Sequence, residues 1–205
     1  MSLVMRPAEG RDSGNASVLL AETTRGFGVA ALGLGKPELQ LKALEKWFAG
    51  RGNRFSFEHT LIAEMDGAAA GLLLRFAGAK LAALEIGCGR QIFSIYGVIG
   101  AFKMIWRNKV LANAKEAEKD EYFIAHLAVD ARFRKQGIGQ ALMERAITET
   151  REHGLSKLAL EVEIGNDPAI QLYQKMDFKI INTIEFNKKA DVLQCPGFHK
   201  MLRTV

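Results

Sequence analysis

The residues best suited to chemistry form one short stretch, Arg134 to Gly139 (RKQGIG). It follows a predicted buried strand over Tyr122 to Val129 and opens a predicted helix that extends to about His153. At a helix start several backbone N–H groups lack an intrahelical acceptor, and the helix dipole adds partial positive charge. Two glycines leave these groups sterically open. The stretch therefore predicts a phosphate- or pyrophosphate-binding turn, although an ordinary strand-to-helix turn with a basic rim has the same glycine spacing.

A second segment with the same setting, Asn166 to Phe178, follows a predicted strand over Leu158 to Ile164 and also opens a helix. Together the two segments resemble the GNAT superfamily of acyl-CoA-dependent N-acyltransferases. The first pattern of that family is Arg or Gln, two residues, Gly, one residue, then Gly or Ala. The positions that match the two family patterns are Arg134, Gly137 and Gly139 in the first segment, and Asn166, Ala169, Leu172-Tyr173 and Phe178 in the second.

The resemblance is detailed from Tyr122 to Phe178 and only topological before that. One departure is Asp177, which stands where the family usually has a glycine that ends the helix in a left-handed conformation. Aspartate tolerates that conformation better than most residues, so we expect the fold to accommodate it.

The resemblance implies acetyl-CoA (coenzyme A) as the ligand, with no metal. Backbone N–H groups of the turn would contact the pyrophosphate, and the preceding strand would pair with the pantetheine arm by its edge. Asn166 would lie near that arm or at the helix start, and these two roles are compatible. The implied coenzyme-binding residues are Leu127, Ala128, Val129, Arg134, Lys135, Gln136, Gly137, Ile138, Gly139 and Asn166.

Acetyl transfer to an amine also needs a neutral amine and a proton for the departing thiolate. Tyr173 is the candidate acid, because a phenol with a pKa near 10 is protonated at neutral pH. A buried core tyrosine is the alternative interpretation. Around Glu161 the Leu-Glu-Val sequence resembles the protein N-terminal alanine-type acetyltransferases, which implies Glu161 as the base. Glu163, on the same predicted face, is its competitor, and direct loss of the proton to water stays open.

Two positions on the fourth predicted strand often carry a carboxylate or histidine in the resembled family. Here they hold Phe123 and Ala125, neither of which can accept a proton. His126 is adjacent, but strand alternation places it on the opposite face from Ala125. We therefore interpret His126 as structural or supporting more readily than as a base.

Charge and cysteine usage limit the function classes. The net charge of +5 suits a polyanionic ligand such as a coenzyme, and equally a generic basic surface. No basic tract is interleaved with aromatic residues, so nucleic-acid binding is not predicted. The two cysteines, Cys88 and Cys195, have neither metal-ligand spacing nor a disulfide framework, which favours a reducing, cytoplasmic location. The apolar stretch Ile92 to Trp106 is too short to span a bilayer and contains Lys103, so no membrane partner is expected.

The first half of the chain predicts a strand, two helices and a hairpin. Pro37 suits the first turn of a helix that Gly50 to Asn53 ends, and Gly26 to Gly35 predicts a flexible loop before it. Asp66-Gly67 is a strong two-residue hairpin signal. The expected elements here are a strand over 4–7, a helix from Ser13 or Asn15 through Thr24, the helix after Pro37, and strands over Thr60 to Met65 and Ala68 to Phe76.

Residues 78–120 separate the third and fourth predicted strands, where the resembled family has a short loop. Long loops without structure are uncommon, so an extra helical insertion is predicted. Its apolar block over Phe93 to Trp106 could pack on the core, cover the acyl acceptor or form a dimer contact. The charged run Lys115 to Asp120 is expected to be solvated. After Leu158 to Ile164, two more strands over Ile180 to Phe186 and Phe198 to Thr204 are expected to be antiparallel.

These elements predict a single N-acetyltransferase domain over residues 4–205, with residues 1–3 left outside because they could be an expression remnant. The resemblance implies an α/β (α+β) fold with a mixed, mostly antiparallel central sheet of about six to seven strands. Its fourth and fifth strands would splay apart, and helices would cover both faces.

The leading functional hypothesis is an acetyl-CoA-dependent N-acetyltransferase that acts on a primary amine by direct attack in a ternary complex. The acceptor could be a small molecule or a protein amine, and a homodimer stays open. The alternative is a non-catalytic acyl-CoA-binding or regulatory module of the same fold. A nucleotide-binding regulator is disfavoured, because no Gly-Lys-Ser/Thr sequence follows the glycine turn.

Overall fold

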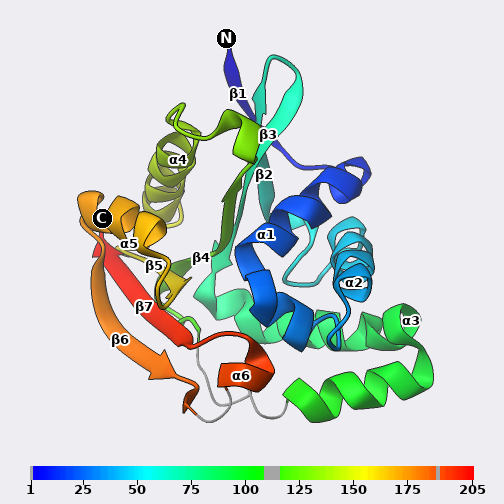
Figure 1. Ribbon diagram of the computed structural model, residues 1–205. Helices are drawn as coiled ribbons and strands as arrows, with labels where there is room; N and C mark the ends of the chain where they lie inside the picture. Colours follow the sequence, from blue (N-terminus) through cyan, green and yellow to red (C-terminus); the bar gives the residue numbers. More distant parts are fainter. Residues whose placement is uncertain (1, 109–115, 188–189) are drawn as a thin grey trace.

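A seven-stranded sheet forms the centre of the protein in a computed structural model, which describes residues 2–108, 116–187 and 190–205 (Figure 1). The strand order is β1-β2-β3-β4-β5-β7-β6, and β4 and β5 are parallel while the other neighbours are antiparallel. The predicted mixed, mostly antiparallel sheet is confirmed. Its strands are β1 (Leu3–Pro7), β2 (Thr60–Met65), β3 (Ala68–Ala77), β4 (Glu121–Val129), β5 (Lys157–Glu163), β6 (Lys179–Glu185) and β7 (Gly197–Thr204).

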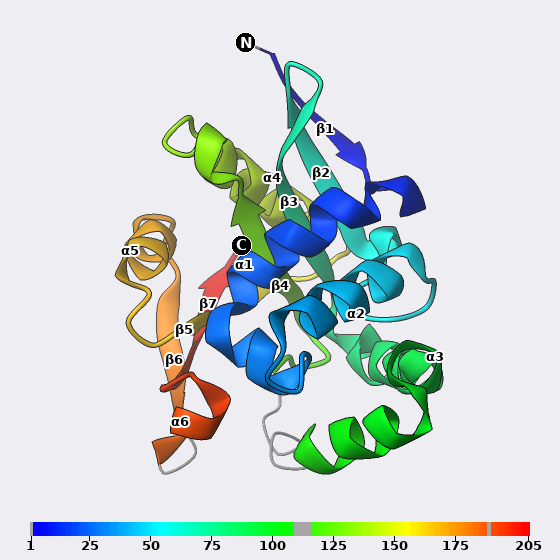
Figure 2. The same ribbon diagram turned by 45° about the vertical axis from the view of Figure 1, so that its right-hand side comes forward.

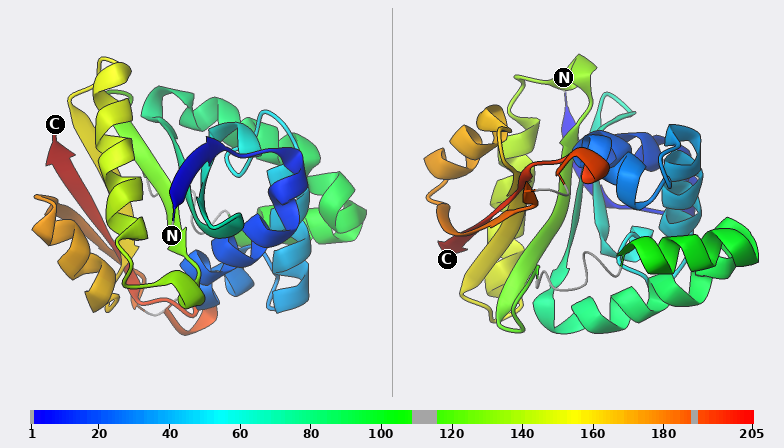
Figure 3. Two further views of the ribbon diagram at one scale, coloured as in Figure 1. Left: turned by 90° about the horizontal axis from the view of Figure 1, so that it is seen from above. Right: turned by 60° about the horizontal axis from the view of Figure 1, so that its bottom comes forward.

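Helices cover both faces of this sheet, as Figure 3 shows from above. On one face α1 (Ser13–Ala31), α2 (Pro37–Ala49) and α3 (Leu81–Asn108) enclose an apolar core with Phe48, Phe76 and Phe123. On the other face α4 (Ile138–Glu152) and α5 (Asp167–Lys175) cover a second core. A short helix, α6 (Ala190–Leu193), lies between β6 and β7.

The hairpin of β2 and β3 turns at Asp66-Gly67, as predicted. Asp66 has φ +50° and Gly67 has φ +81°, the pair of left-handed residues that a tight hairpin turn requires. The helix start at Pro37 is also confirmed. Asp177 adopts φ +63° after α5, so the aspartate takes the left-handed conformation expected at that position.

The predicted loop over Gly26 to Gly35 is wrong for its first part, because α1 continues through Ala31 after a kink at Arg25 (φ +43°), and only residues 32–35 form a turn. Gly28 explains the misinterpretation. A Cβ there would overlap the side chains of Thr24 and Gln40, which are joined by a 2.8 Å hydrogen bond. The glycine thus permits close packing of α1 on α2 rather than flexibility.

The insertion between β3 and β4 is helical, as predicted. α3 breaks at Gly97 (φ +66°), and its second half folds back beside the first (Figure 2). The first half buries Leu84 and Ile92 in the core. Residues 109–115 of the insertion lie outside the described residues.

β4 and β5 part after the pair Ile124–Leu160, which confirms the expected splay. β4 stays paired with β3 up to Val129, and β5 stays paired with β7 up to Glu163. The point of divergence coincides with a β-bulge in β4, where Ala125 is an extra residue between the pairs Ile124–Arg75 and His126–Leu74. A bulge bends its strand and increases the local twist, so β4 leaves β5 at this residue.

Candidate active site

The turn before α4 presents a row of free amides. Gly137 (φ +79°) is the N-cap of α4, and Lys135 (φ +62°) is also left-handed. In the part of the chain that the structure describes, no backbone or side-chain acceptor pairs with the N–H groups of residues 136–139. The helix dipole adds positive charge at the same point. The predicted anion-binding turn therefore has the required geometry.

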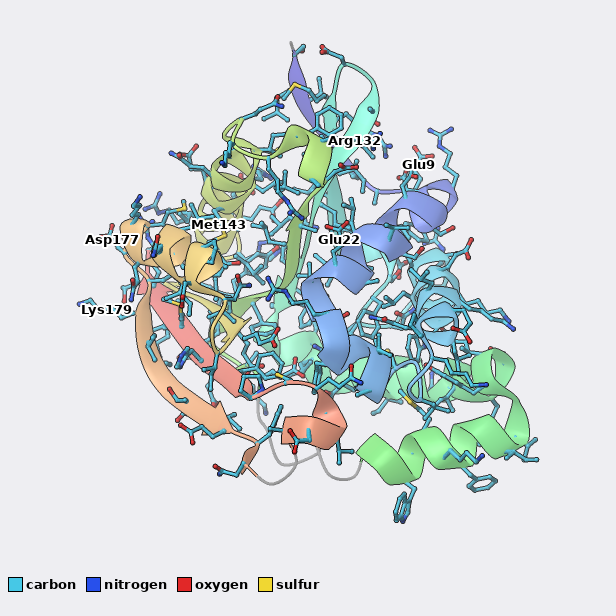
Figure 4. The ribbon with its side chains drawn as sticks, viewed as in Figure 1. Glu9, Glu22, Arg132, Met143, Asp177 and Lys179 are labelled. Carbon is cyan, nitrogen blue, oxygen red and sulfur yellow. The ribbon has the colours of Figure 1, made fainter. Side chains whose placement is uncertain are left out.

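The Arg134 side chain does not lie over this row of amides. Its Nε donates to the Val129 carbonyl oxygen at 3.1 Å, and a terminal nitrogen donates to Glu22 at 3.0 Å. Glu22 lies on α1 (labelled in Figure 4). Arg134 thus connects the turn to β4 and α1, and main-chain groups carry the anion-binding geometry.

A cavity of about 1480 Å³ runs from the turn through the gap between β4 and β5 to α1 and α3. Its volume exceeds the roughly 300–1,000 Å³ of an ordinary ligand pocket, so it has room for two ligands. Of the twelve sequence-predicted residues, all but Gln136 line it: Leu127, Ala128, Val129, Arg134, Lys135, Gly137, Ile138, Gly139, Glu161, Asn166 and Tyr173.

Backbone groups of β4 face this gap. Beyond Ile124 the β5-facing edge of β4 has no strand partner, because the two strands have separated. Leu127, Ala128 and Val129 line the gap with that free edge, although the Val129 carbonyl accepts from Arg134. An extended ligand with amide groups could pair there as an added strand does.

Glu161 places a carboxyl group with a raised pKa in the cavity. Its Oε1 is buried and has no hydrogen-bond partner among the residues that the structure describes. Burial, together with the negative charge of Glu116, raises its pKa to about 8, while Arg54 and Lys200 oppose the shift. A carboxyl group with a pKa near neutrality can exchange a proton with an amine, which is the property expected of a general base.

Tyr173 approaches the cavity from α5 on the other side of the sheet. It is buried against Phe178, with ring centroids 6.0 Å apart. Burial raises its pKa to about 12. Among the described residues its hydroxyl has no hydrogen-bond partner. The phenol thus stays protonated at physiological pH and is free to donate.

Asn166 occupies the N-cap position of α5, as predicted, but its side chain makes no capping hydrogen bond. Its carbonyl oxygen accepts from the amides of Ala169 and Ile170 instead. The carboxamide lines the cavity, so it is available to a ligand.

The prediction that His126 lies on the opposite face from Ala125 is wrong, because the bulge at Ala125 interrupts the alternation of β4. His126 faces α1 and the cavity: its Nδ1 is 2.9 Å from Thr23 Oγ1, and its ring stacks on Phe55. Burial lowers its pKa to about 3, and Arg54 adds to the effect. A neutral, hydrogen-bonded imidazole fits the supporting role that the sequence suggested.

Sequence reasoning missed an ion pair at the α3 end of the cavity. Arg54 donates two hydrogen bonds to Glu116, and Glu85 lies 3.7 Å from the same guanidinium. The expectation that Lys115 to Asp120 is solvated is wrong for Glu116, whose side chain is only 27% exposed. No local pattern marks this pair, since Arg54 lies in a loop and is 62 residues away from Glu116.

None of the described helices could serve as a membrane span. Among the same residues, no group of three or more His, Cys, Asp or Glu side chains is arranged to hold a metal ion.

Comparisons of the sequence and of the structure with known proteins agree on one family. The model of the Acetyltransferase (GNAT) family matches residues 35–178. A [ribosomal protein bS18]-alanine N-acetyltransferase of Escherichia coli K12 is 36% identical over 78 residues, which are 38% of this chain and 53% of that protein. The chain thus spans about half the length of the curated relatives it matches.

Solved structures share the fold at low identity. An N-acetyltransferase from Staphylococcus aureus Mu50 superimposes with a TM-score of 0.72 at 21% identity and covers 98% of this chain and 100% of its own. The NatC complex bound to Gag peptide and CoA gives a TM-score of 0.53 at 16% identity, covering 100% of this chain and 99% of that chain.

Proposed function

The chain belongs to the acetyltransferase (GNAT) family, and from that premise we propose that it transfers an acetyl group from acetyl-CoA to a primary amine. The two substrates would meet in a ternary complex, and the amine would attack the thioester directly. One observation carries the proposal: a single cavity joins the free amides before α4 to a carboxyl group, Glu161, whose pKa is about 8.

The residues of the turn fit the diphosphate of coenzyme A. An added Cβ at Gly137 would meet no atom within 4 Å, so the space above the turn is open to a ligand. The free N–H groups of residues 136–139 would bind the diphosphate, and Lys135 adds charge at the rim. The free edge of β4 at Leu127 to Val129 and the Asn166 carboxamide would hold the pantetheine arm. Acetyl-CoA supplies the activated acyl group as a substrate.

Glu161 is proposed as the general base. Its pKa of about 8 is close to that of an α-amino group, about 7.7–8.0, so proton transfer between them is nearly balanced. Brønsted behaviour makes such a match efficient near neutral pH. The Oε1 atom without a hydrogen-bond partner is the acceptor that an incoming ammonium group could satisfy.

Tyr173 is proposed as the acid that protonates the departing thiolate. Its hydroxyl stays protonated because burial raises its pKa to about 12. It enters the cavity from α5, whereas Glu161 enters from β5. The acid and the base therefore come from two different elements that line one cavity, which suits a donor and an acceptor held between them.

The acceptor end of the cavity suits an amine with an apolar neighbour. Its walls are largely apolar, and its charged groups include both signs, because Arg54 pairs with Glu116 and Lys119 also lines the cavity. The E. coli relative acts on a ribosomal protein, so a protein amine is one proposed acceptor class and a small amine is the other. The lining residues that support this are Leu32, Trp47, Glu85, Ile92, Met104, Glu116, Glu161 and Glu163, with Phe27, Phe186 and Phe198 in mutual ring contact at one side.

The two thiols, Cys88 and Cys195, are free, which fits a reducing compartment. A cytoplasmic location is proposed on that ground.

The test is thiol release from acetyl-CoA with a panel of acceptors. The panel holds alkyl amines of increasing length, a diamine and short peptides with free N-termini. Amine-dependent thiol release, with the acetyl group found on the amine by mass spectrometry, supports the proposal. Tight coenzyme A binding with no turnover on any acceptor would contradict it and favour the acyl-CoA-binding module.

A further inference from the structure

The second half of α3, which lies at the edge of the molecule (Figures 1 and 2), carries a row of large, solvent-exposed apolar side chains. Their exposed fractions lie between 41% and 78%. Phe93 of the first half extends the row, because its ring packs edge to face against Phe102 with centroids 6.2 Å apart. The row consists of Phe93, Val98, Ile99, Phe102, Ile105 and Trp106, and we call it the α3 face.

The inward contacts of this half-helix are few. Between Val98 and Trp106, the buried residues that the structure describes are Ala101 and Met104. The break at Gly97 separates this segment from the well-packed first half. A helix of this length is marginal in water unless an amphipathic face is packed. The segment thus exposes more large apolar side chains than it buries among its described residues, which is unfavourable in water.

The area of the α3 face is that of a protein interface. Six large side chains at about 150–250 Å² each, exposed by roughly half to three quarters, give on the order of 700 Å². This exceeds the roughly 300–600 Å² of the largest apolar patch on a typical monomer. It approaches the roughly 800 Å² that each partner contributes to a standard stable interface.

We propose that the α3 face is a homodimer interface, in which the second half of α3 packs on the same half-helix of a second copy about a two-fold axis. Val98, Phe102 and Ile105 follow each other at helical spacings of four and three, so they form a ridge that a crossing copy can interdigitate. An isologous contact of this kind needs only one self-complementary patch.

Charge on the α3 face is compatible with a second copy. The row contains no carboxylate, and Lys103 is the one described cation within Val98 to Trp106. Two copies can therefore meet without strong like-charge repulsion. An anionic lipid surface is the competing occupant, because Lys103 and Arg107 both belong to the second half of α3, and the vesicle experiment below distinguishes the two.

Dimerisation would also reduce the motion of the cavity wall at the acceptor end. Met104 and Ile105 line the cavity from the segment that carries the α3 face. Ordering of this wall by a second copy would lower the KM of the acceptor. That consequence, unlike the interface itself, rests on the proposed acetyl transfer.

The interface is tested by molar mass, which needs no activity assay. Light scattering after size exclusion should give twice the 22.6 kDa chain mass for the wild type. The double variant Phe102→Glu/Trp106→Glu should be monomeric, because four buried carboxylates cannot be desolvated at a two-fold contact. Lys103→Glu on the same helix and Val18→Glu on α1 (51% exposed) are matched controls that should stay dimeric.

A second measurement needs no variant. Amide exchange over residues 98–106 of the wild type should slow as the protein concentration rises toward about 100 μM, following mass action. A wild type that is monomeric at this concentration, or a dimer that survives the double variant, would overturn the proposal. A monomer that floats with phosphatidylglycerol vesicles would overturn it in favour of a lipid surface. A wild-type protein that is dimeric but transfers no acetyl group to any acceptor would contradict only the proposed function.

Discussion

Replacing Glu161 with glutamine should lower activity and raise stability together. Folding raises the pKa of Glu161 from 4.5 to about 8, so between these pH values the folded protein binds more protons than the unfolded chain. Wild-type stability therefore falls as pH rises through this window. A difference of one pKa unit corresponds to 1.36 kcal/mol.

The size of the effect follows from this linkage. With pKa values of 4.5 and about 8, the carboxyl group lowers the free energy of unfolding by about 3 kcal/mol at pH 7 and by under about 1 kcal/mol at pH 5. Glutamine does not titrate, so the stability of Glu161→Gln relative to wild type should increase by roughly 2.5 kcal/mol from pH 5 to pH 7. For a chain of this size that is a Tm difference of roughly 5–10 °C.

The rate should respond in the opposite sense. About one tenth of Glu161 is ionised at pH 7 if its pKa is about 8, so at saturating amine the wild-type kcat should rise roughly tenfold by pH 9. Glu161→Gln should lose this rise and fall by about 10²-fold, with coenzyme A affinity unchanged.

Urea unfolding at pH 5 and pH 7, and kcat from pH 6 to pH 9, measure the two effects. Glu163→Gln is the matched control, because Glu163 lies two residues further along β5 and lines the same cavity. An equal stability difference at both pH values would refute the raised pKa. A variant with the wild-type pH–rate profile would remove Glu161 from the mechanism.

Three further changes test other parts of the site. In Gly139→Ala the added methyl group fits the fold, since its nearest neighbours would lie at 3.7 Å or more, so Tm should be unchanged. The methyl group would crowd the ligand side of the amide row, so coenzyme A binding measured by calorimetry should weaken about tenfold. Tyr173→Phe should lower kcat by about 10²-fold while the acceptor KM stays constant. If ionisation of Tyr173 already reduced the wild-type kcat at pH values below 10, that result would contradict its pKa of about 12. Arg75→Met removes two hydrogen bonds, at 2.7 and 2.9 Å, from the buried carboxylate of Glu149 and should cost about 3 kcal/mol in urea unfolding, whereas the more exposed partner Arg145→Met should cost less than about 1 kcal/mol.

The sequence predicted the fold where the signal is local. The Asp66-Gly67 dipeptide favours a tight turn of two left-handed residues, and Pro37 favours the first turn of a helix. Both positions have the predicted geometry. Gly28 shows the limit of such signals. A glycine in a flexible loop and a glycine in a close helix–helix contact look alike in a sequence, and the difference is decided by Gln40, which lies on another helix.

The candidate site was predictable where backbone groups define it, and less so where distant side chains do. The amide row before α4 follows from the order of glycines and from the helix start. The ion pair of Arg54 and Glu116 does not, because it joins residues 62 positions apart that meet only after α3 folds back. The raised pKa of Glu161 comes first from burial, with Glu116 and Arg54 acting in opposite senses, so it depends on tertiary structure and could not be derived from the residue type alone.

One extra residue in β4 accounts for several features of the site at once. The bulge at Ala125 lies where pairing with β5 ends, so it opens the gap that becomes the cavity. The same extra residue interrupts the alternation of β4, so His126 faces α1 and the cavity, where its ring contacts Thr23. A flat β4 would pair with β5 along its whole length and would bury the edge of Leu127 to Val129. The gap for an extended ligand and the orientation of His126 into the cavity therefore have a common structural origin. Because burial lowers the pKa of His126 to about 3, Glu161 of β5 stays the proposed base.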